Sequence, residues 1–435
     1  MAQSSENSRR ILERLLLASG DDALEVRHRP RLPADHPLPP RFKGSSGLSA
    51  EAIDGRRSLL REQGIAIDHL TESAEFGDAS CLDGNIENFI GFAQIPVGVV
   101  GPLRVNGSRA TGDYYVPMAT TEGALVASYQ RGAQLVNQAG GCAAACLTEA
   151  VLRAPCFEFD RLATAGQFLA EVLQLVDVLK DTVAQTSRFC RLLDVRPSLL
   201  GKELYLILEF FPGDASGQNM VTLATEAVCK TLLERVQIAP QRWYIEGNLS
   251  GDKKATMLAF STARGKKVLA ECVIDKKLVR RYLHTTPEAM IRYWQVSVLG
   301  GVQSGSIGVH GHYANALTAL FIACGQDVAC VSEASVGVTR MDRTEDGDLY
   351  VSVSLPNLIV GTVGGGTHLP SARECLRMLD CIGEGTAPKL AEICAATVLA
   401  GEVSIIGSMS AGDFAQAHSD YGRRKPPNND NRPDS

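Results

Sequence analysis

The stretch Tyr244-Ile-Glu-Gly-Asn-Leu-Ser-Gly-Asp-Lys-Lys-Ala-Thr256 separates two apolar, regularly patterned segments of the chain. Its polar residues and glycines predict a loop between structured elements. Functional side chains often lie on such loops, because a rigid scaffold holds them in place. Lys253 in this lysine loop is therefore a candidate for stabilising an oxygen that becomes negative during a reaction. Taken alone, the stretch favours an ordinary solvated surface loop, because short motifs often match by chance.

Length and composition indicate an ordinary globular protein. The 435 residues are enough for two or three domains, with 45% hydrophobic and 21% charged residues. The net charge of -6 gives no reason to expect binding to nucleic acid or to an anionic membrane. The N-terminus has no apolar core of signal-peptide length, and no run of about 18 apolar residues predicts a transmembrane helix.

Twelve cysteines are scattered along the chain. They form no Cys-x-x-Cys pair and no Cys/His zinc spacing, so we predict no metal site. In so long a chain they are typical of reduced, mostly buried thiols, which fits a cytoplasmic protein.

The two ends of the chain are predicted to lie outside the main domains. Residues 1–82 are expected to form a small helical part and a linker. Helical patterns run over 11–17 and 49–66, the second capped by Ser49, and the segment 28–46 is rich in proline, histidine and basic residues. Residues 424–435 predict a disordered tail.

A large domain is predicted from two segments, residues 83–158 and 247–423. Prolines and glycines within Ile95–Pro102 predict a shaped turn there rather than a long strand. A helix over 121–136 would place Glu122 in its first turn, where the helix dipole favours a carboxylate, and simple capping is the alternative role. Strands are predicted over 267–274 and 349–353, helices over 287–299, 312–324 and 387–410, and a Gly/Ser-rich turn over 300–308.

Residues 159–246 are predicted to form a smaller, inserted domain. Helices are expected over 167–186 and 222–236, and a strand over 203–211. The turn Gly213-Asp-Ala-Ser-Gly-Gln-Asn-Met220 precedes the second helix. Free backbone amides at a helix start bind phosphate well, although this turn lacks the GxGxxG pattern of doubly wound folds.

The order and spacing of several motifs resemble the 3-hydroxy-3-methylglutaryl-CoA (HMG-CoA) reductase family, from about residue 80 to about residue 424. Besides the lysine loop, the matching motifs are Glu87-Asn-Phe-Ile-Gly91, Ile95-Pro-Val-Gly-Val-Val-Gly-Pro102, Pro117-Met-Ala-Thr-Thr-Glu-Gly123, Gly325-Gln-Asp327, Gly361-Thr-Val-Gly-Gly-Gly-Thr367 and Ala411-Gly-Asp-Phe-Ala-Gln-Ala-His418. The resemblance implies a mixed α/β (α+β) fold, with a ferredoxin-like NADP-binding domain inserted into a large domain. It also implies at least a homodimer with the active site between subunits. Family members in animals and fungi usually carry a membrane anchor, and this chain looks like the soluble catalytic part alone.

The resemblance implies reduction of a thioester to a primary alcohol with two molecules of NADPH. Lys253 would stabilise the first oxyanion. His418 would protonate the leaving thiolate, and Glu122, with a pKa raised by burial, would protonate the product oxygen. Asp327 would lie between Lys253 and Glu122.

The resemblance also implies which residues hold the cofactor. Ser187, Arg188 and Phe189 match the family segment that binds the extra phosphate of NADP, and a guanidinium suits a phosphate dianion. Further cofactor contacts are expected from the dinucleotide motif and the Gly-rich loop, at Asp214, Gly217, Asn219, Met220, Gly364 and Gly365.

Departures from the family fall in the expected substrate subsite. Lys254 is retained, but Glu246, Glu158 and Val296 stand where a serine, an arginine and a lysine usually hold the substrate carboxylate. These changes would favour a neutral or ammonium-bearing acyl group. The alternative is an alignment slip, with Arg153 reaching into the site. The other expected substrate contacts are Arg131, His312 and Asn315.

Reduction of HMG-CoA to mevalonate, a step of isoprenoid biosynthesis, is the expected function. The first alternative is the same chemistry on another acyl thioester, attached to coenzyme A or to a carrier protein, because His284 stands where a lysine is common near coenzyme A. The second alternative is a non-catalytic binding protein, which NADPH binding without turnover would support.

Overall fold

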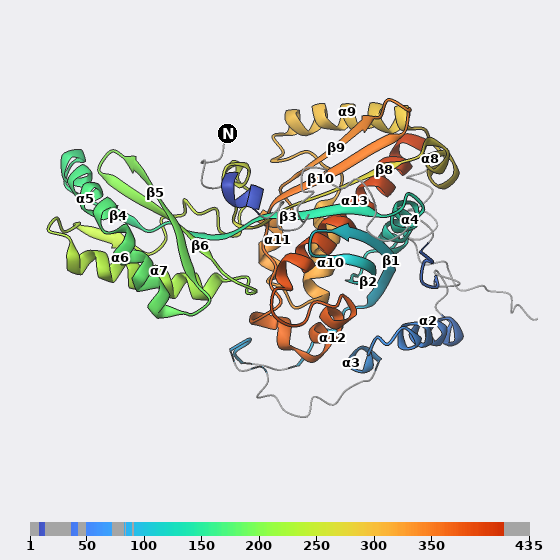
Figure 1. Cartoon of the computed structure of the whole chain (residues 1–435), viewed down its shortest axis with the longest axis horizontal. Coiled ribbons are helices and arrows are strands. Elements are labelled where there is room, and N and C mark those ends of the chain that lie inside the picture. The colour runs from blue at the N-terminus through green and yellow to red at the C-terminus, as the bar shows by residue number, and fades with distance from the viewer. Residues whose placement is uncertain are drawn as a thin grey trace, which may run out of the picture.

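Two hydrophobic cores lie side by side, and one long strand runs through both, as Figure 1 shows. The computed structural model describes residues 8–13, 36–41, 49–71, 82, 84–88 and 91–412. The shared strand is β3 (Cys142–Arg153), which pairs with β8 in the large sheet and with β6 in the small sheet. The smaller core already includes Val151 and Phe157, which precede the predicted domain start at residue 159.

The large domain is built on a sheet of order β2-β1-β3-β8-β10-β9. Every pairing is antiparallel except the short contact between β1 and β3. The predicted strands over 267–274 and 349–353 are confirmed as parts of longer strands. The strands are β1 (Val97–Gly107), β2 (Thr111–Ala119), β8 (Gly265–Ile274), β9 (Val338–Arg343) and β10 (Leu349–Leu358).

Helices pack against this sheet and around the central helix α13. The predicted helices over 312–324 and 387–410 are confirmed, whereas the predicted turn over 300–308 is partly wrong. There α9 continues to Ser304 and ends at Gly305, whose φ of 73° closes the helix. The helices are α4 (Leu125–Gln138), α8 (Lys276–Leu283), α9 (Pro287–Ser304), α10 (Tyr313–Ala323), α11 (Val331–Ala334), α12 (Pro370–Met378) and α13 (Ala387–Ala411).

Helix α13 forms the centre of the large domain. It is apolar on all sides and contacts β3, β8, β10 and four helices. Its length and composition suit a membrane span, yet 94% of an apolar stretch of 18 residues within it is buried inside the structure. A helix that is hydrophobic all round is typical of a large core, and that is its place here.

Close packing between α4 and α13 depends on Gly132. A Cβ atom at this position would lie 1.8 Å from the backbone oxygen of Ala400. We therefore expect Gly132→Ala to lower the free energy of unfolding by about 3 kcal/mol, because a backbone atom cannot move aside cheaply. Urea unfolding measures this. As a matched control, Gly166→Ala in α5 meets no atom within 4 Å and should cost nothing. Equal losses in both variants would contradict this account of the packing.

The small domain has a ferredoxin-like arrangement. Its strands lie in the order β7-β4-β6-β5, all antiparallel, and helices connect β4 to β5 and β6 to β7. The predicted strand over 203–211 is confirmed. The elements are β4 (Cys156–Glu158), α5 (Leu162–Gln174), α6 (Val176–Thr186), β5 (Arg191–Leu200), β6 (Glu203–Phe211), α7 (Gln218–Arg235) and β7 (Arg242–Tyr244).

The single helix predicted over 167–186 is wrong, because the chain bends by 65° between α5 and α6. Leu175 occupies the bend and packs against the small core. Both helices turn apolar side chains into that core, Phe168 and Val172 from α5 and Leu179 and Val183 from α6. The bend allows the apolar faces of both short helices, α5 and α6, to pack on the core of the small domain.

The turn predicted over 95–102 is also wrong, because Val97 begins β1. A bulge between Val100 and Leu103 accommodates the Gly-Pro pair. The side chain of Gln130 from α4 replaces the missing strand partner: it accepts from the Gly101 N–H at 2.8 Å and donates to the Gly101 carbonyl at 3.0 Å. A contact from a distant helix therefore sustains the strand.

The N-terminal part docks on the large domain through α2 (Ala50–Glu62) and α3 (Asp68–Thr71). The Ser49 hydroxyl accepts from the Ala52 N–H at 3.2 Å, so the predicted cap is confirmed. Leu60 and Ile67 bury themselves with residues of β2 and α12. A helix was predicted over 11–17, and the described residues 8–13 are helical. The tail, most of the 28–46 linker, and the remainder of that helix lie outside the described residues.

Candidate functional site

The lysine loop follows β7 and leads into a short 3-10 helix, Met257–Phe260, between the two cores. Lys253 Nζ lies 2.8 Å from Asp327 Oδ2, and the two side chains are 44% and 38% exposed. The hydrogen bond that Lys253 donates to Asp327 raises the pKa of Lys253. Burial would raise the pKa of Asp327, but the hydrogen bond and charge of Lys253 outweigh it and hold that pKa below its usual range. Both groups are therefore charged at neutral pH.

The backbone of Lys253 is held in an unusual conformation. Its φ of 54° lies in the left-handed region, which costs a non-glycine residue about 1–2 kcal/mol. Two hydrogen bonds offset this cost: the Lys253 N–H donates to Glu333 Oε1 at 3.0 Å, and the Lys253 carbonyl accepts from Ser332 Oγ at 2.8 Å. Helix α11 thus sets the direction in which the lysine side chain leaves the loop.

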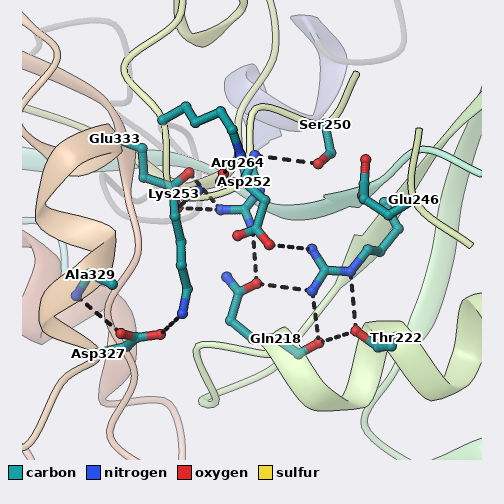
Figure 2. A network of polar contacts seen from close by, with 12 residues as sticks. Gln218, Thr222, Glu246, Ser250, Asp252, Lys253, Arg264, Asp327, Ala329 and Glu333 are labelled. Carbon is teal, nitrogen blue, oxygen red and sulfur yellow. Dashed lines mark hydrogen bonds and ion pairs between the residues drawn. The ribbon is translucent and has the colours of Figure 1, made fainter. Parts of the chain in front are cut away.

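A network of buried charges lies beneath the loop, as Figure 2 shows. Arg264 and Glu333, whose side chains are 1% and 0% exposed, meet through Arg264 Nη1 and both carboxylate oxygens at 2.5 Å. Arg264 Nη2 also bonds Asp252 Oδ1, and Arg153 Nη1 lies 3.1 Å from Asp252 Oδ2. Arg264 and Glu333 could not be predicted from the sequence, because no motif or spacing links them to the lysine loop.

Glu122 lies in a loop before α4, not in the first turn of a helix as predicted. The helix begins only at Leu125, after Ala124 with a φ of 69°. Glu122 is exposed, and its two oxygens accept from Asn315 Nδ2 at 3.3 and 3.2 Å. Among the described residues Asp327 contacts Lys253 but not Glu122, so its predicted place between the two is not observed. His418 lies outside the described residues.

Most of the predicted cofactor residues gather where α6 ends and α7 begins. Ser187 Oγ donates to Met220 Sδ at 3.5 Å and accepts from the Phe189 N–H at 3.2 Å. The Arg188 guanidinium lies over the Phe189 ring, 4.6 Å from its centre. Gly217 caps α7 with a φ of 84°, and Asn219 is exposed in the first turn.

A cavity of about 450 Å³ opens between the two domains beside these residues. Asp214 bridges the domains there, because its carboxylate accepts from the Gly385 and Ala387 N–H groups at the start of α13. Lys253 lies outside the cavity. The lining residues are Arg188, Phe189, Arg191, Phe211, Gly213 and Asp214 from the small domain and Ser108, Arg109, Cys146, Glu149, Glu384, Gly385 and Pro388 from the large domain.

The glycines at 364–366 bring two loops together. A Cβ on Gly325 would lie 2.3 Å from the Gly366 backbone oxygen, so the close approach is between two backbones, next to Asp327. Gly364 and Gly365 have φ values of 80° and 56° and open space where a Cβ would stand. They are needed for the turn, and they leave room beside it.

Three predicted substrate residues have partners within the chain. Arg131 donates along α13 to the Ser404 carbonyl at 2.9 Å and to Ser408 Oγ at 3.1 Å. His312 Nδ1 lies 3.0 Å from Oε1 of the fully buried Glu402, and Lys254 Nζ donates to the Asp252 carbonyl at 2.9 Å. Burial would raise the pKa of Glu402, but the hydrogen bond and charge of His312 hold it below its usual range.

In the single chain, each residue of the proposed altered subsite has surroundings of its own. Glu158 on β4 pairs with Lys202 at 2.8 Å and Arg242 at 3.6 Å. Glu246 accepts from the Ala154 and Asn248 N–H groups, and Val296 lies exposed on α9. Arg153 instead reaches the lysine loop through Asp252, as the alternative alignment allowed.

Eleven cysteines fall in the part of the chain that the structure describes, and all are buried free thiols. Burial raises the pKa of Cys272 to about 12, so this thiol is unreactive at neutral pH. Within the same residues, no group of three or more His, Cys, Asp or Glu side chains is arranged to hold a metal ion.

Comparison with known proteins identifies the family. The family model for hydroxymethylglutaryl-coenzyme A reductase matches residues 52–423. The 3-hydroxy-3-methylglutaryl-coenzyme A reductase of Pyrococcus abyssi is 40% identical over 378 residues, which cover 85% of this chain and 91% of that protein. The enzyme of Methanocaldococcus jannaschii is 39% identical over 373 residues, covering 85% of this chain and 92% of that protein.

A solved structure supports the fold. The class II 3-hydroxy-3-methylglutaryl-CoA reductase from Streptococcus pneumoniae, bound to NADPH in open conformations, matches with a TM-score of 0.69 and 19% identity, covering 85% of this chain and 99% of that chain. At this identity the likeness concerns the fold alone. The predicted resemblance and mixed α/β fold are confirmed, and the chain belongs to the HMG-CoA reductase family.

Proposed function

We propose that this protein is an oxidoreductase that reduces HMG-CoA to mevalonate with two molecules of NADPH. The observation that carries the proposal is the Lys253–Asp327 ion pair, held at 2.8 Å on a loop between two domains. A fixed cation is what a reaction through an oxyanion requires. The family match over residues 52–423 supports the substrate and the chemistry.

Lys253 would act in the first reduction. As the thioester carbonyl is reduced, its oxygen becomes negative, and a lysine that stays charged stabilises it. Asp327 keeps the ammonium group charged and aimed, and Glu333 fixes the backbone that carries it. The Coulomb attraction grows as bound reactants exclude water from this half-exposed group.

Two further proton donors would complete the reaction. The tetrahedral product of the first step expels the thiolate of coenzyme A, which His418 would protonate. The resulting aldehyde is reduced in the second step, and Glu122 would protonate its oxygen while Asn315 holds the carboxyl group. Because Glu122 is exposed in the single chain, the bound reactants and a second subunit would have to bury it for this role. This need supports the proposed homodimer.

The cavity between the domains fits a phosphorylated dinucleotide. Arg188 provides a cation for the extra phosphate of NADPH, and Gly217 leaves free amides at the start of α7. Space beside Gly364 and Gly365 allows a ligand to approach the backbone there. NADPH, when bound, supplies the hydride for each reduction.

HMG-CoA is a better substrate for this chain than the neutral or amino-bearing thioester considered from the sequence. Relatives that are 38–42% identical carry the name HMG-CoA reductase, and Glu158, one of the three departing residues, is paired with Lys202 within the chain. Arg153 and Lys254 remain near the lysine loop as cations for the substrate carboxylate. We further propose a cytoplasmic enzyme of isoprenoid biosynthesis.

The test is a stoichiometric assay with the purified protein. With HMG-CoA and NADPH we expect mevalonate, identified by mass spectrometry, at two NADPH oxidised per product. NADH should serve poorly at the same concentration, because it lacks the phosphate that Arg188 would bind. Bound NADPH with no mevalonate formed would contradict the proposal and point to another thioester or to a binding protein.

A further inference from the structure

Gln218, the first residue of α7, has an amide whose orientation is fixed. Its Oε1 accepts from Arg264 Nη2 at 2.8 Å and from Arg153 Nη2 at 3.4 Å. A guanidinium group can only donate hydrogen bonds, so the oxygen of the amide must face the two arginines. The nitrogen therefore faces the opposite way, and an amide flip would place two donors against two donors.

The amide nitrogen of Gln218 has no partner of its own. Among the described residues, Nε2 is a buried atom without a hydrogen-bond acceptor. An unmade buried hydrogen bond costs about 1–3 kcal/mol. In Figure 2 the nitrogen lies on the side of the Gln218 amide where the Lys253 side chain ends at Asp327. Within the described part of the chain, Gln218 Nε2 thus has no acceptor, whereas the Lys253 ammonium group pairs with Asp327.

The surrounding charges hold this donor in place before any ligand arrives. Arg264 is anchored by Glu333 and Asp252, and Arg153 by Asp252 and by Thr222 Oγ1 at 3.1 Å. The donor also lies directly after Gly217, in the segment that the proposed function assigns to the cofactor. A rigid, unpaired donor in such a position is arranged to meet an oxygen of a bound molecule.

We infer that Gln218 Nε2 donates a hydrogen bond to a carbonyl oxygen of the bound reactants. This inference rests on the proposed reductase function and adds a binding residue to it. Two carbonyl groups have the required chemistry: the carboxamide of the nicotinamide ring and the thioester that is reduced. The amide of Gln218 would then hold the reactants from the start of α7, while Lys253 acts from the lysine loop.

Two variants of similar length test the donor. Gln218→Glu keeps oxygens for both arginines but removes the N–H groups, and Gln218→Met removes both functions without adding charge. We expect both variants to lose about 10-fold either in kcat/KM for HMG-CoA or in the affinity for NADP⁺. Gln167→Glu, the same change at an exposed position of α5, should leave both quantities unchanged. Thermal unfolding of each variant checks that the fold is retained.

The two measurements distinguish the possible acceptors. Weaker NADP⁺ binding by calorimetry with an unchanged KM for HMG-CoA would assign the nicotinamide carboxamide. A lower kcat/KM for HMG-CoA with unchanged NADP⁺ binding would assign the thioester. Less than a twofold change in both quantities would overturn the inference, as would a loss confined to Gln218→Glu, which would reflect added charge. Failure of the wild-type protein to form mevalonate would refute the proposed function separately, and NADP⁺ binding alone would then decide the role of Gln218.

Discussion

Lys253→Ala is expected to lower kcat for HMG-CoA reduction by about 10³-fold or more, while NADP⁺ still binds. The loss corresponds to about 4 kcal/mol of transition-state stabilisation, because an oxyanion would form with no cation beside it. NADP⁺ affinity should be retained, since Lys253 lies outside the cavity that carries Arg188. Single-turnover reduction followed at the NADPH absorbance, with calorimetry for binding, measures both quantities.

A second lysine provides the control for this experiment. Lys180 on α6 also pairs with an aspartate, Asp177, at 3.1 Å, but far from the lysine loop. Lys180→Ala should keep the wild-type rate, and Asp327→Asn should show a smaller loss than Lys253→Ala because the cation remains. A Lys253→Ala protein that still turns over at one tenth of the wild-type rate would refute the assigned role.

Glu333→Ala is expected to destabilise the protein by about 3–5 kcal/mol. The substitution leaves Arg264 buried without its main counter-charge and removes the acceptor of the Lys253 N–H. Breaking a buried ion pair from one side is costly, because the remaining charge stays out of water. Equilibrium unfolding in urea measures the change, and the reduction rate should fall as well since the lysine loop loses its anchor.

The matched control is an exposed ion pair. Glu226 pairs with Lys230 on the surface of α7 at 2.7 Å, and the two side chains are 43% and 63% exposed. Glu226→Ala should cost less than about 1 kcal/mol, because water already screens the pair. A similar loss of stability in Glu226→Ala and Glu333→Ala would show that the buried network contributes no more than an ordinary surface contact.

Elements with strong local signals could be predicted from the sequence. Ser49 caps α2 as expected, and the patterns of β6 and α13 gave their type and nearly their bounds. The predictions were wrong for elements that depend on distant partners. β1 contains Gly101 and Pro102, and it stays a strand only because Gln130 of α4 supplies the missing hydrogen bonds.

The predictions for the site residues can be divided in the same way. Lys253 and Asp327 were predicted together and are in contact, and most of the residues predicted to bind the cofactor lie where α6 ends and α7 begins. Glu122 was placed in a helix that begins only after it, because an apolar pattern marks a helix but not its first residue. The altered subsite stays a prediction: within the single chain Glu158 pairs with Lys202, and a position matched along the chain need not reach the site in space.

The sequence by itself determined the family and predicted the order of the domains and the chemical residues, because ordered motifs with the right spacing are a property of the chain alone. Only the tertiary structure decided what holds Lys253 in position. Arg264, Glu333, Arg153 and Gln218 come from four separate segments, and no local pattern links any of them to the lysine loop. Buried charges find their partners through the packing of whole domains, where an unpaired charge is too costly to survive.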